Sequence, residues 1–253
     1  MPWSSWRAHF ERNALRPLPA PPRDCDGIPQ PWRAPLLRSL ARFQVGEAGE
    51  GRIARQIDRV ALPGVDDDYR VALKLFVREE GRHARILGDI IRAMGGSLLR
   101  GHWTEQAFVG ARRLAGVRAK LLVLLAAEVV GIAFYGAVAA ALPACDVRDR
   151  LAELCADEAM HLQFHVEFFR SQTPTLARRL AFASAWSLVG ASASALVIAD
   201  HRETLRALEI TPRAVARALL AQVHGVTRAV VERPPARAFP RHGSSAILDG
   251  RAQ

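Results

Sequence analysis

Two pairs of residues in this sequence have the types and the spacing of a metal site. Glu80 and His83 are three residues apart in FVREEGRHARIL, and Glu158 and His161 repeat that spacing in LCADEAMHLQFH. Positions i and i+3 share one face of a helix, so each pair can direct a carboxylate oxygen and an imidazole nitrogen to the same point. Carboxylate and imidazole both bind first-row transition metals, so the pairs indicate such a site.

A centre of two metals between helices needs further glutamates, because bridging carboxylates offset the charge of the ions. Glu128 is the only charge from Leu121 to Leu142, and an ionised carboxylate in such an apolar run is costly to bury without a cation. Upstream, FQVGEAGEGRIARQI offers Glu47 and Glu50, one turn apart on one helix face. The predicted set is therefore a single glutamate from each of two helices and a Glu-x-x-His pair from each of two others.

The elements that must position these residues are long helices. The apolar spacing is helical through the middle of the chain, without the regular turn residues that several short strands would need. Proline and glycine divide this region into helices of about 25 residues. We expect ligand-bearing helices at about 34–61, from after the acidic stretch 66–68 to near 95–96, at about 104–142 and at about 147–171. The third is expected to be broken near Gly110 or Gly116, and further helices are expected at about 175–207 and 212–232.

The ends of the chain differ from its middle. Six prolines lie between Pro17 and Pro31, so residues 1–33 are expected to form an extended, proline-rich N-terminal arm. Residues 233–253, rich in proline, glycine and serine, are expected to form a flexible C-terminal tail. A length of 253 residues, half of them hydrophobic, fits one domain between these ends, at residues 34–232.

The order Glu, Glu-x-x-His, Glu, Glu-x-x-His resembles the ferritin-like di-iron carboxylate superfamily over about residues 36–171. The resemblance implies an all-α fold, a ferritin-like four-helix bundle with additional C-terminal helices here. It also implies a cofactor of two iron ions, or a Mn/Fe pair. FQVGEAGEGR is similar to the first-helix motif of rubrerythrins, in which the glutamate of a Gly-Glu pair is the ligand. This favours Glu47, while Glu50 remains open as the ligand, an extra ligand or an outer group.

Glu79 and Asp157 each directly precede a predicted ligand glutamate. In bacterial multicomponent di-iron hydroxylases and ribonucleotide reductase small subunits, an acid in this place hydrogen-bonds the histidine of the opposite helix. The resemblance thus pairs Glu79 with His161 and Asp157 with His83, which would fix the histidine tautomers. The alternative is that both acids are solvated helix residues.

Two more side chains lie within helical reach of the predicted site. His165 is one turn beyond His161, and we expect an outer or core histidine rather than the extra ligand found in di-iron arylamine N-oxygenases. Tyr135 is two turns after Glu128, and we expect it to pack in the core. A redox-active or hydrogen-bonding phenol is the alternative for Tyr135.

Composition indicates which partners the protein binds and in which compartment it lies. The net charge of +10 comes almost wholly from scattered arginines rather than basic blocks interleaved with aromatics, so nucleic-acid binding is not expected. The three cysteines are widely spaced and form no Cys-x-x-Cys, which argues against a disulfide framework and a rubredoxin-type centre and fits a cytoplasmic protein. The N-terminus also lacks the apolar stretch of a signal peptide.

Residues 181–199 are uncharged and just long enough to cross a bilayer. Four serines, one glycine and many alanines lower the hydrophobicity of this segment. We therefore expect it to pack in the bundle or against a second subunit of a homodimer, rather than to span a membrane.

The resemblance implies a site that binds and reduces dioxygen or peroxide. We predict an iron-dependent oxygenase or oxidase with a small organic substrate and an external electron donor, since the arm and the C-terminal helices can enclose a cavity. The alternatives are a non-enzymatic, iron-handling ferritin-like protein, a rubrerythrin-like peroxidase, and a structural bundle whose site has decayed. The chain is longer and more basic than a ferritin, and it lacks the paired cysteines of a rubredoxin domain.

Overall fold

All regular structure in the described part of the chain is helical. The computed structural model describes residues 2–23, 25, 27–48, 53–99, 101 and 116–232. Glu50 and the predicted tail at 233–253 lie outside these residues. In chain order the elements are α1 (Trp3–Ala14), α2 (Gln30–Glu47), α3 (Ile53–Gln56) with a 3₁₀ turn (Ile57–Arg59), α4 (Asp67–Ala93), α6 (Val117–Ala141), α7 (Asp146–Gln172), α8 (Leu176–Asp200), α9 (Arg202–Ala207) and α10 (Pro212–Val231).

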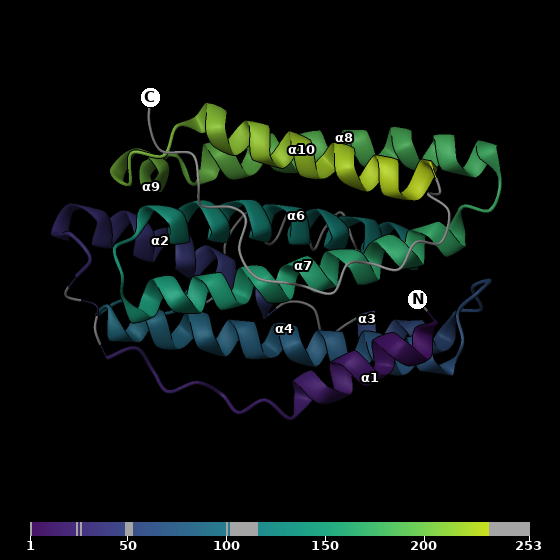
Figure 1. Cartoon of the computed structure of the whole chain (residues 1–253), viewed down its shortest axis with the longest axis horizontal. Helices are drawn as coiled ribbons and strands as arrows, with labels where there is room; N and C mark the ends of the chain where they lie inside the picture. The colour runs from purple at the N-terminus through teal and green to yellow at the C-terminus, as the bar shows by residue number, and fades with distance from the viewer. Residues whose placement is uncertain are drawn as a thin grey trace.

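Four long helices form the central bundle. α6 packs along α7, α2 packs along α4, and α4 also contacts α7. Figure 1 shows α8 and α10 as a layer over α6 and α7, with α1 against α4 on the opposite side. The predicted all-α fold with additional C-terminal helices is confirmed.

The ends of α4 follow from its sequence. The side chain of Asp66 caps the helix by accepting a hydrogen bond from the backbone N–H of Tyr69 at 2.9 Å. Asp67 and Asp68 occupy the first turn, where carboxylates favour the positive end of the helix dipole. Gly95, just beyond the helix, has a φ of 80°, a left-handed conformation that favours glycine. The predicted helix from the aspartates to Gly95 is therefore confirmed.

The two helices that follow also match the prediction in most of their length. α7 (Asp146–Gln172) is within a residue of the predicted 147–171. α6 begins at Val117 after Gly116, one of the two glycines at which a break was expected, and it ends before Pro143. Residues 102–115, the first part of the predicted third helix, lie outside the described residues.

The predicted first ligand helix, about 34–61, is wrong at both ends. α2 starts at Gln30, because Pro31 sits in the first turn, where the missing proline N–H has no helical partner to lose. The helix ends at Glu47 rather than running to Ala61, and α3 is a separate short helix. Glycines at 46, 49 and 51 give the physical reason, since glycine disfavours helix.

The predicted extended arm is wrong for residues 3–14, which form α1. Pro2 only precedes the helix and the next proline is Pro17, whereas Trp3, Trp6 and Phe10 have the i, i+3, i+7 spacing of a helix stripe. Trp6 and Phe10 are buried, and all three rings contact Phe164 of α7. These contacts hold α1 on the bundle, so that the end of this helix reaches the site described below.

Two helices, α6 and α8, are long and apolar enough to cross a membrane by length and composition alone. The apolar window of α6 is 67% buried inside the bundle, as in the core helix of a soluble protein, and the window of α8 is 33% buried. α8 packs against α6 and α10, and Trp186 donates a hydrogen bond to the carbonyl of Val223 on α10 at 2.9 Å. The segment 181–199 thus packs on the bundle through one face.

Candidate metal centre

The four bundle helices bring the predicted ligands to one place. Three glutamates are almost completely buried, with 2 to 4% of each residue exposed, and both histidines are fully buried. Glu47, at the end of α2, is partly buried. The members of this group, called the metal centre below, are Glu47 (α2), Glu80 and His83 (α4), Glu128 (α6), and Glu158 and His161 (α7).

The Glu-x-x-His pairs of α4 and α7 face each other. Ligand atoms of Glu80, His83, Glu158 and His161 all lie within 4.8 Å of one another. Nδ1 of His161 is 2.8 Å from Oε1 of Glu80 and 3.2 Å from Oε2 of Glu158. Nδ1 of His83 is 3.1 Å from Oε1 of Glu158. Both imidazoles therefore direct Nδ1 toward the carboxylates.

Several buried atoms of the metal centre lack a hydrogen bond of acceptable geometry within the described residues. Oε1 of Glu80, Nδ1 of His83 and Oε1 of Glu158 are all in this state. A buried polar atom without a partner is costly, and these three converge on one point. The donor set of carboxylate oxygens and imidazole nitrogens therefore fits transition-metal ions.

The carboxylates crowd one another. Burial, followed by the charges of neighbouring carboxylates, raises the pKa of Glu80 and Glu158 and holds that of Glu47 well above its usual range. Burial lowers the pKa of His83 and His161, but hydrogen bonds and charges from the surrounding acids more than reverse this and raise both pKa values well above the usual range. The centre thus concentrates negative charge that calls for cations.

Glu128 and Glu47 lie at the edge of this cluster. Oε2 of Glu128 is 3.6 Å from Nδ1 of His161. Oε1 of Glu47 accepts a hydrogen bond of 2.7 Å from the hydroxyl of Tyr135. The expectation that Tyr135 only packs is therefore wrong, because its buried hydroxyl needs a partner and finds one in a predicted ligand.

The outer acids lie behind the histidines. Nε2 of His83 is 3.3 Å from Oδ2 of Asp157, and Nε2 of His161 is 3.4 Å from Oε2 of Glu79. Both acids are buried, so the interpretation as solvated residues is wrong. With Nε2–H directed to an acid, Nδ1 of each ring is the nitrogen that faces the centre and could bind a metal ion there.

The segment just after α1 supplies a cation that sequence reasoning missed. Nη1 and Nη2 of Arg16 donate to the two oxygens of Asp157 at 3.0 and 2.8 Å, and Nη2 also donates to Glu79. Asn13 adds a hydrogen bond of 3.0 Å to Glu79. The aromatic stripe Trp3, Trp6, Phe10 was the available signal for a helix here, but nothing in the sequence shows which acids its end reaches.

His165 is fully buried one turn beyond His161. Nε2 of His165 is 3.6 Å from Oε1 of Glu128, too far for a good hydrogen bond, and the ring packs edge-on against Phe76. Burial, aided by the charge of His161, lowers the pKa of His165 to about 3. The ring is therefore neutral, and it lines the apolar side of the centre.

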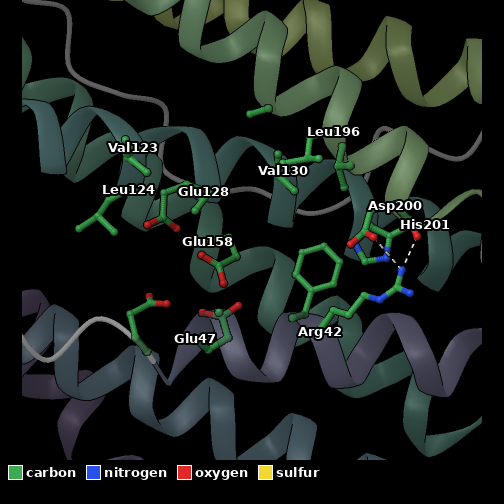
Figure 2. A pocket seen from close by; sticks show the side chains of 16 residues that line it. Arg42, Glu47, Val123, Leu124, Glu128, Val130, Glu158, Leu196, Asp200 and His201 are labelled. Atoms are coloured by element: carbon green, nitrogen blue, oxygen red, sulfur yellow. Dashed lines mark hydrogen bonds and ion pairs between the residues drawn. The ribbon is translucent and has the colours of Figure 1, made fainter. Parts of the chain in front are cut away.

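A cavity of about 140 Å³ adjoins the carboxylates between α2, α6 and α8. Glu47, Glu80, Glu128 and Glu158 line one part, and the middle is lined mostly by apolar side chains such as Phe43 and Val197. Arg42, Asp200 and His201 line the remaining part (Figure 2). The first two were not singled out in the sequence, and His201 was expected to be an ordinary helix residue.

Comparisons with known proteins give similarity in structure only. No protein-family model matches the sequence, and no curated protein matches it. Three solved structures of R2-like ligand-binding oxidases are similar. Two are point mutants with anaerobically reconstituted Mn/Fe cofactor: one has 14% identity and a TM-score of 0.66, and the other has 13% identity and a TM-score of 0.65. The third, without metal cofactor, has 13% identity and a TM-score of 0.62. Each match covers 91% of this chain, and 94%, 93% and 97% of the respective structures. The chain therefore has the ferritin-like helical-bundle fold that the order of its glutamates and histidines predicts.

Proposed function

We propose that this chain is an oxidase that holds two metal ions, Fe/Fe or Mn/Fe, in the metal centre and uses dioxygen to oxidise a small organic substrate. The observation that carries the proposal is the convergence of unpartnered, buried ligand atoms of Glu80, His83 and Glu158 beside a partly open, largely apolar cavity. The names of the similar structures support it, since they are oxidases and two of them contain Mn/Fe.

The predicted ligands divide between the two ions by helix. One histidine from α4 and one from α7 would supply nitrogen ligands, and the four glutamates would supply oxygen ligands. When bound, two such ions supply redox chemistry, because together they deliver two electrons to dioxygen. An external donor would return those electrons after each turnover. The division of ligands and the donor are both part of the proposal.

The chain's own residues prepare the site for this chemistry. Glu79 and Asp157 accept the Nε2–H of the histidines, so that Nδ1 is the nitrogen left to bind a metal ion. Arg16 pairs with both acids from outside and offsets part of their negative charge. Tyr135 holds Glu47 by its hydroxyl.

The cavity favours an oxidase over an iron-handling protein. Iron storage needs a path for many ions and no apolar chamber, whereas the chamber here is lined largely by side chains such as Val123, Leu124 and Leu196. Apolar walls exclude water and leave room for an organic substrate next to the metals.

Metal loading tests the proposal. The metal-free protein is loaded with ferrous ion anaerobically, desalted and analysed for iron, with Glu128→Gln as the test variant. Glu203→Gln is the matched control, since Glu203 has a side chain that is 57% exposed and far from the centre in sequence. We expect about two irons per chain in the wild type and the control, and less than about one in Glu128→Gln.

The reaction of the ferrous protein with dioxygen then distinguishes an oxidase from an iron-handling protein and a peroxidase. Stoichiometric consumption of dioxygen by the ferrous protein, with no growth of a mineral, supports the oxidase. Accumulation of many irons per chain would identify an iron-handling protein instead. A reaction with hydrogen peroxide that is much faster than the reaction with dioxygen would favour a peroxidase.

A further inference from the structure

The layer formed by α8 and α10 presents one broad surface to the outside. The two helices pack on each other and both contact α6, so their outward faces lie on the same side of the molecule (Figure 1). The exposed residues of α8 up to Ala199 and of α10 are called the α8–α10 face below. The chain has 25 acidic residues, yet neither 176–199 nor 212–231 contains one. The α8–α10 face therefore has no negative side chain of its own.

Exposed leucines are concentrated on the α8–α10 face. Eight large hydrophobic side chains are exposed among the described residues, and four of them lie here, between 55% and 71% exposed. These four are Leu176, Leu180, Leu188 and Leu220. The exposed positions between the leucines of α8 are alanine or serine, as at Ala181, Ser184 and Ala191. Contiguous apolar surface of this kind marks a site of interaction with a protein or a membrane.

Arginine supplies the charge of the α8–α10 face. Arg178, Arg213 and Arg217 are exposed, and none of them forms an ion pair with an acid in the part of the chain that the structure describes. Arg228 differs, because its Nε is 3.1 Å from Oε2 of Glu232, just beyond α10. The face therefore carries uncompensated positive charge beside its exposed leucines.

An anionic lipid bilayer matches both properties. Helices that lie on membranes combine apolar side chains, which enter the boundary between headgroups and acyl chains, with arginine or lysine, which attract anionic headgroups. The opposite side of α8 is already occupied, since Trp186 and Val197 are buried. α8 can therefore lie along a membrane surface while it stays packed on the bundle.

Other occupants match less well. A two-fold interface with a second copy would bring the unpaired arginines of both copies to one surface without acids, and their repulsion opposes such a dimer. Single-stranded nucleic acid is bound through aromatic side chains that stack on bases, but both aromatic residues of these helices, Phe182 and Trp186, are buried.

We propose that the α8–α10 face binds the surface of an anionic lipid bilayer. α8 lies in the plane of the headgroups, with Leu180 and Leu188 inserted between them, and Arg213 and Arg217 of α10 bind lipid phosphates. The inference is independent of the proposed oxidase function, because it uses no residue of the metal centre.

Sedimentation with vesicles tests the proposal. The full chain is mixed with vesicles of phosphatidylcholine, or of phosphatidylcholine with about one-quarter phosphatidylglycerol, at about 0.1 M salt. We expect at least about tenfold tighter binding to the anionic vesicles, and a loss of at least about tenfold at about 1 M salt, where charges are screened. Equal binding to both kinds of vesicle would overturn the proposal, and so would no binding to the anionic vesicles.

A pair of arginine variants locates the charged part of the surface. One arginine near an anionic membrane strengthens binding about fivefold, so Arg213→Gln/Arg217→Gln should weaken binding to anionic vesicles at least about tenfold. Arg12→Gln/Arg78→Gln is the matched control, since it removes the same charge from exposed positions of α1 and α4 on the opposite side of the bundle. An equal loss in both double variants would show attraction by net charge alone and overturn the assignment to this face.

A pair of leucine variants tests the apolar part. Leu188 is 71% exposed, and Leu188→Ser should weaken binding to anionic vesicles at least about fivefold. Leu15→Ser, at a position 83% exposed just after α1, should leave binding unchanged. Unchanged binding by Leu188→Ser would overturn the insertion of α8. Circular dichroism of each variant shows that the fold persists.

Two further measurements identify a different occupant. Sedimentation velocity without lipid reports the oligomeric state, and a dimer that Leu188→Glu dissociates, in a chain that does not bind anionic vesicles, would assign the face to a second copy. Tighter binding to duplex DNA than to anionic vesicles at the same salt concentration would assign it to nucleic acid. Either result would overturn the proposal.

Discussion

Arg16 connects the N-terminal helix to the metal centre, and its replacement by alanine should destabilise the fold measurably. The guanidinium donates to both oxygens of Asp157 and to Glu79. These carboxylates have side chains that are only 10% and 5% exposed. Arg16→Ala leaves them buried without their principal cation.

The size of the effect follows from these contacts. Removing one partner of a buried ion pair costs about 3–5 kcal/mol. Two features reduce that figure here: the side chain of Arg16 is 33% exposed, and Nη1 of Arg82 lies 3.8 Å from Asp157 as a partial substitute. We therefore expect Arg16→Ala to lower the free energy of unfolding by about 2–3 kcal/mol at neutral pH.

The pH dependence provides a second signature. Burial raises the pKa of Asp157 and Glu79, but hydrogen bonds from His83 and Arg16 to Asp157, and from His161 and Asn13 to Glu79, hold both values below the usual range. A lowered folded-state pKa stabilises the protein above the unfolded value, near pH 4, and this stabilisation is lost as the pH falls through the folded value. The difference between wild type and Arg16→Ala should therefore shrink below about pH 4.

Urea unfolding of the metal-free protein, followed by circular dichroism at neutral and acid pH, measures both effects. Arg12→Ala is the matched control, since Arg12 is exposed in the last turn of α1, four residues before Arg16. Arg16→Lys should fall between wild type and alanine, because lysine keeps the charge without the bidentate geometry. A loss smaller than about 0.5 kcal/mol in Arg16→Ala, or a loss that persists unchanged in acid, would refute the reasoning.

Three further changes test other parts of the structure. Glu128→Ala should reduce bound metal by at least about tenfold while the far-ultraviolet circular dichroism stays helical, because apolar helix faces supply most of the packing; unchanged metal content would show that Glu128 is not a ligand. Tyr135→Phe removes the 2.7 Å hydrogen bond to Glu47 and should lower the free energy of unfolding by about 1.5–3 kcal/mol in urea, and an unchanged value would contradict the bond. Gly190→Ala places a methyl group 2.8 Å from Cγ2 of Val223, so the free energy of unfolding in urea should fall by about 1–3 kcal/mol. Adding Val223→Ala to the same chain should restore part of the lost stability, because it removes the atom that the methyl group meets.

The sequence predicted those parts of the site in which the residues concerned lie on one helix. The i, i+3 spacing of Glu80 with His83 places both on one helix face whatever surrounds them, and the same holds for Glu158 with His161. Glu128 was conspicuous because it is the single charge in the apolar run from Leu121 to Leu142, and a buried charge needs a counterion. The pairing of outer acids with opposite histidines came from a family resemblance, and the distances agree with it.

Contacts between distant segments had no such local signal. The sequence shows that α1 has an aromatic stripe, but the position of Arg16 against Glu79 depends on how that stripe packs over α4. The hydroxyl of Tyr135 meets Glu47 only because α2 and α6 approach each other at this level of the bundle.

By itself, the sequence determined the helical class, the order of the ligand-bearing helices and five of the six predicted ligands, because helix periodicity and the cost of a buried charge act within single segments. Only the tertiary structure decided what lies on either side of the site. Arg16 pairs with the acids behind the histidines on one side, and the cavity lined by Arg42, Asp200 and His201 lies on the other. Those features arise where helices far apart in the sequence meet, and the side chains that meet there are set by the packing of the whole bundle.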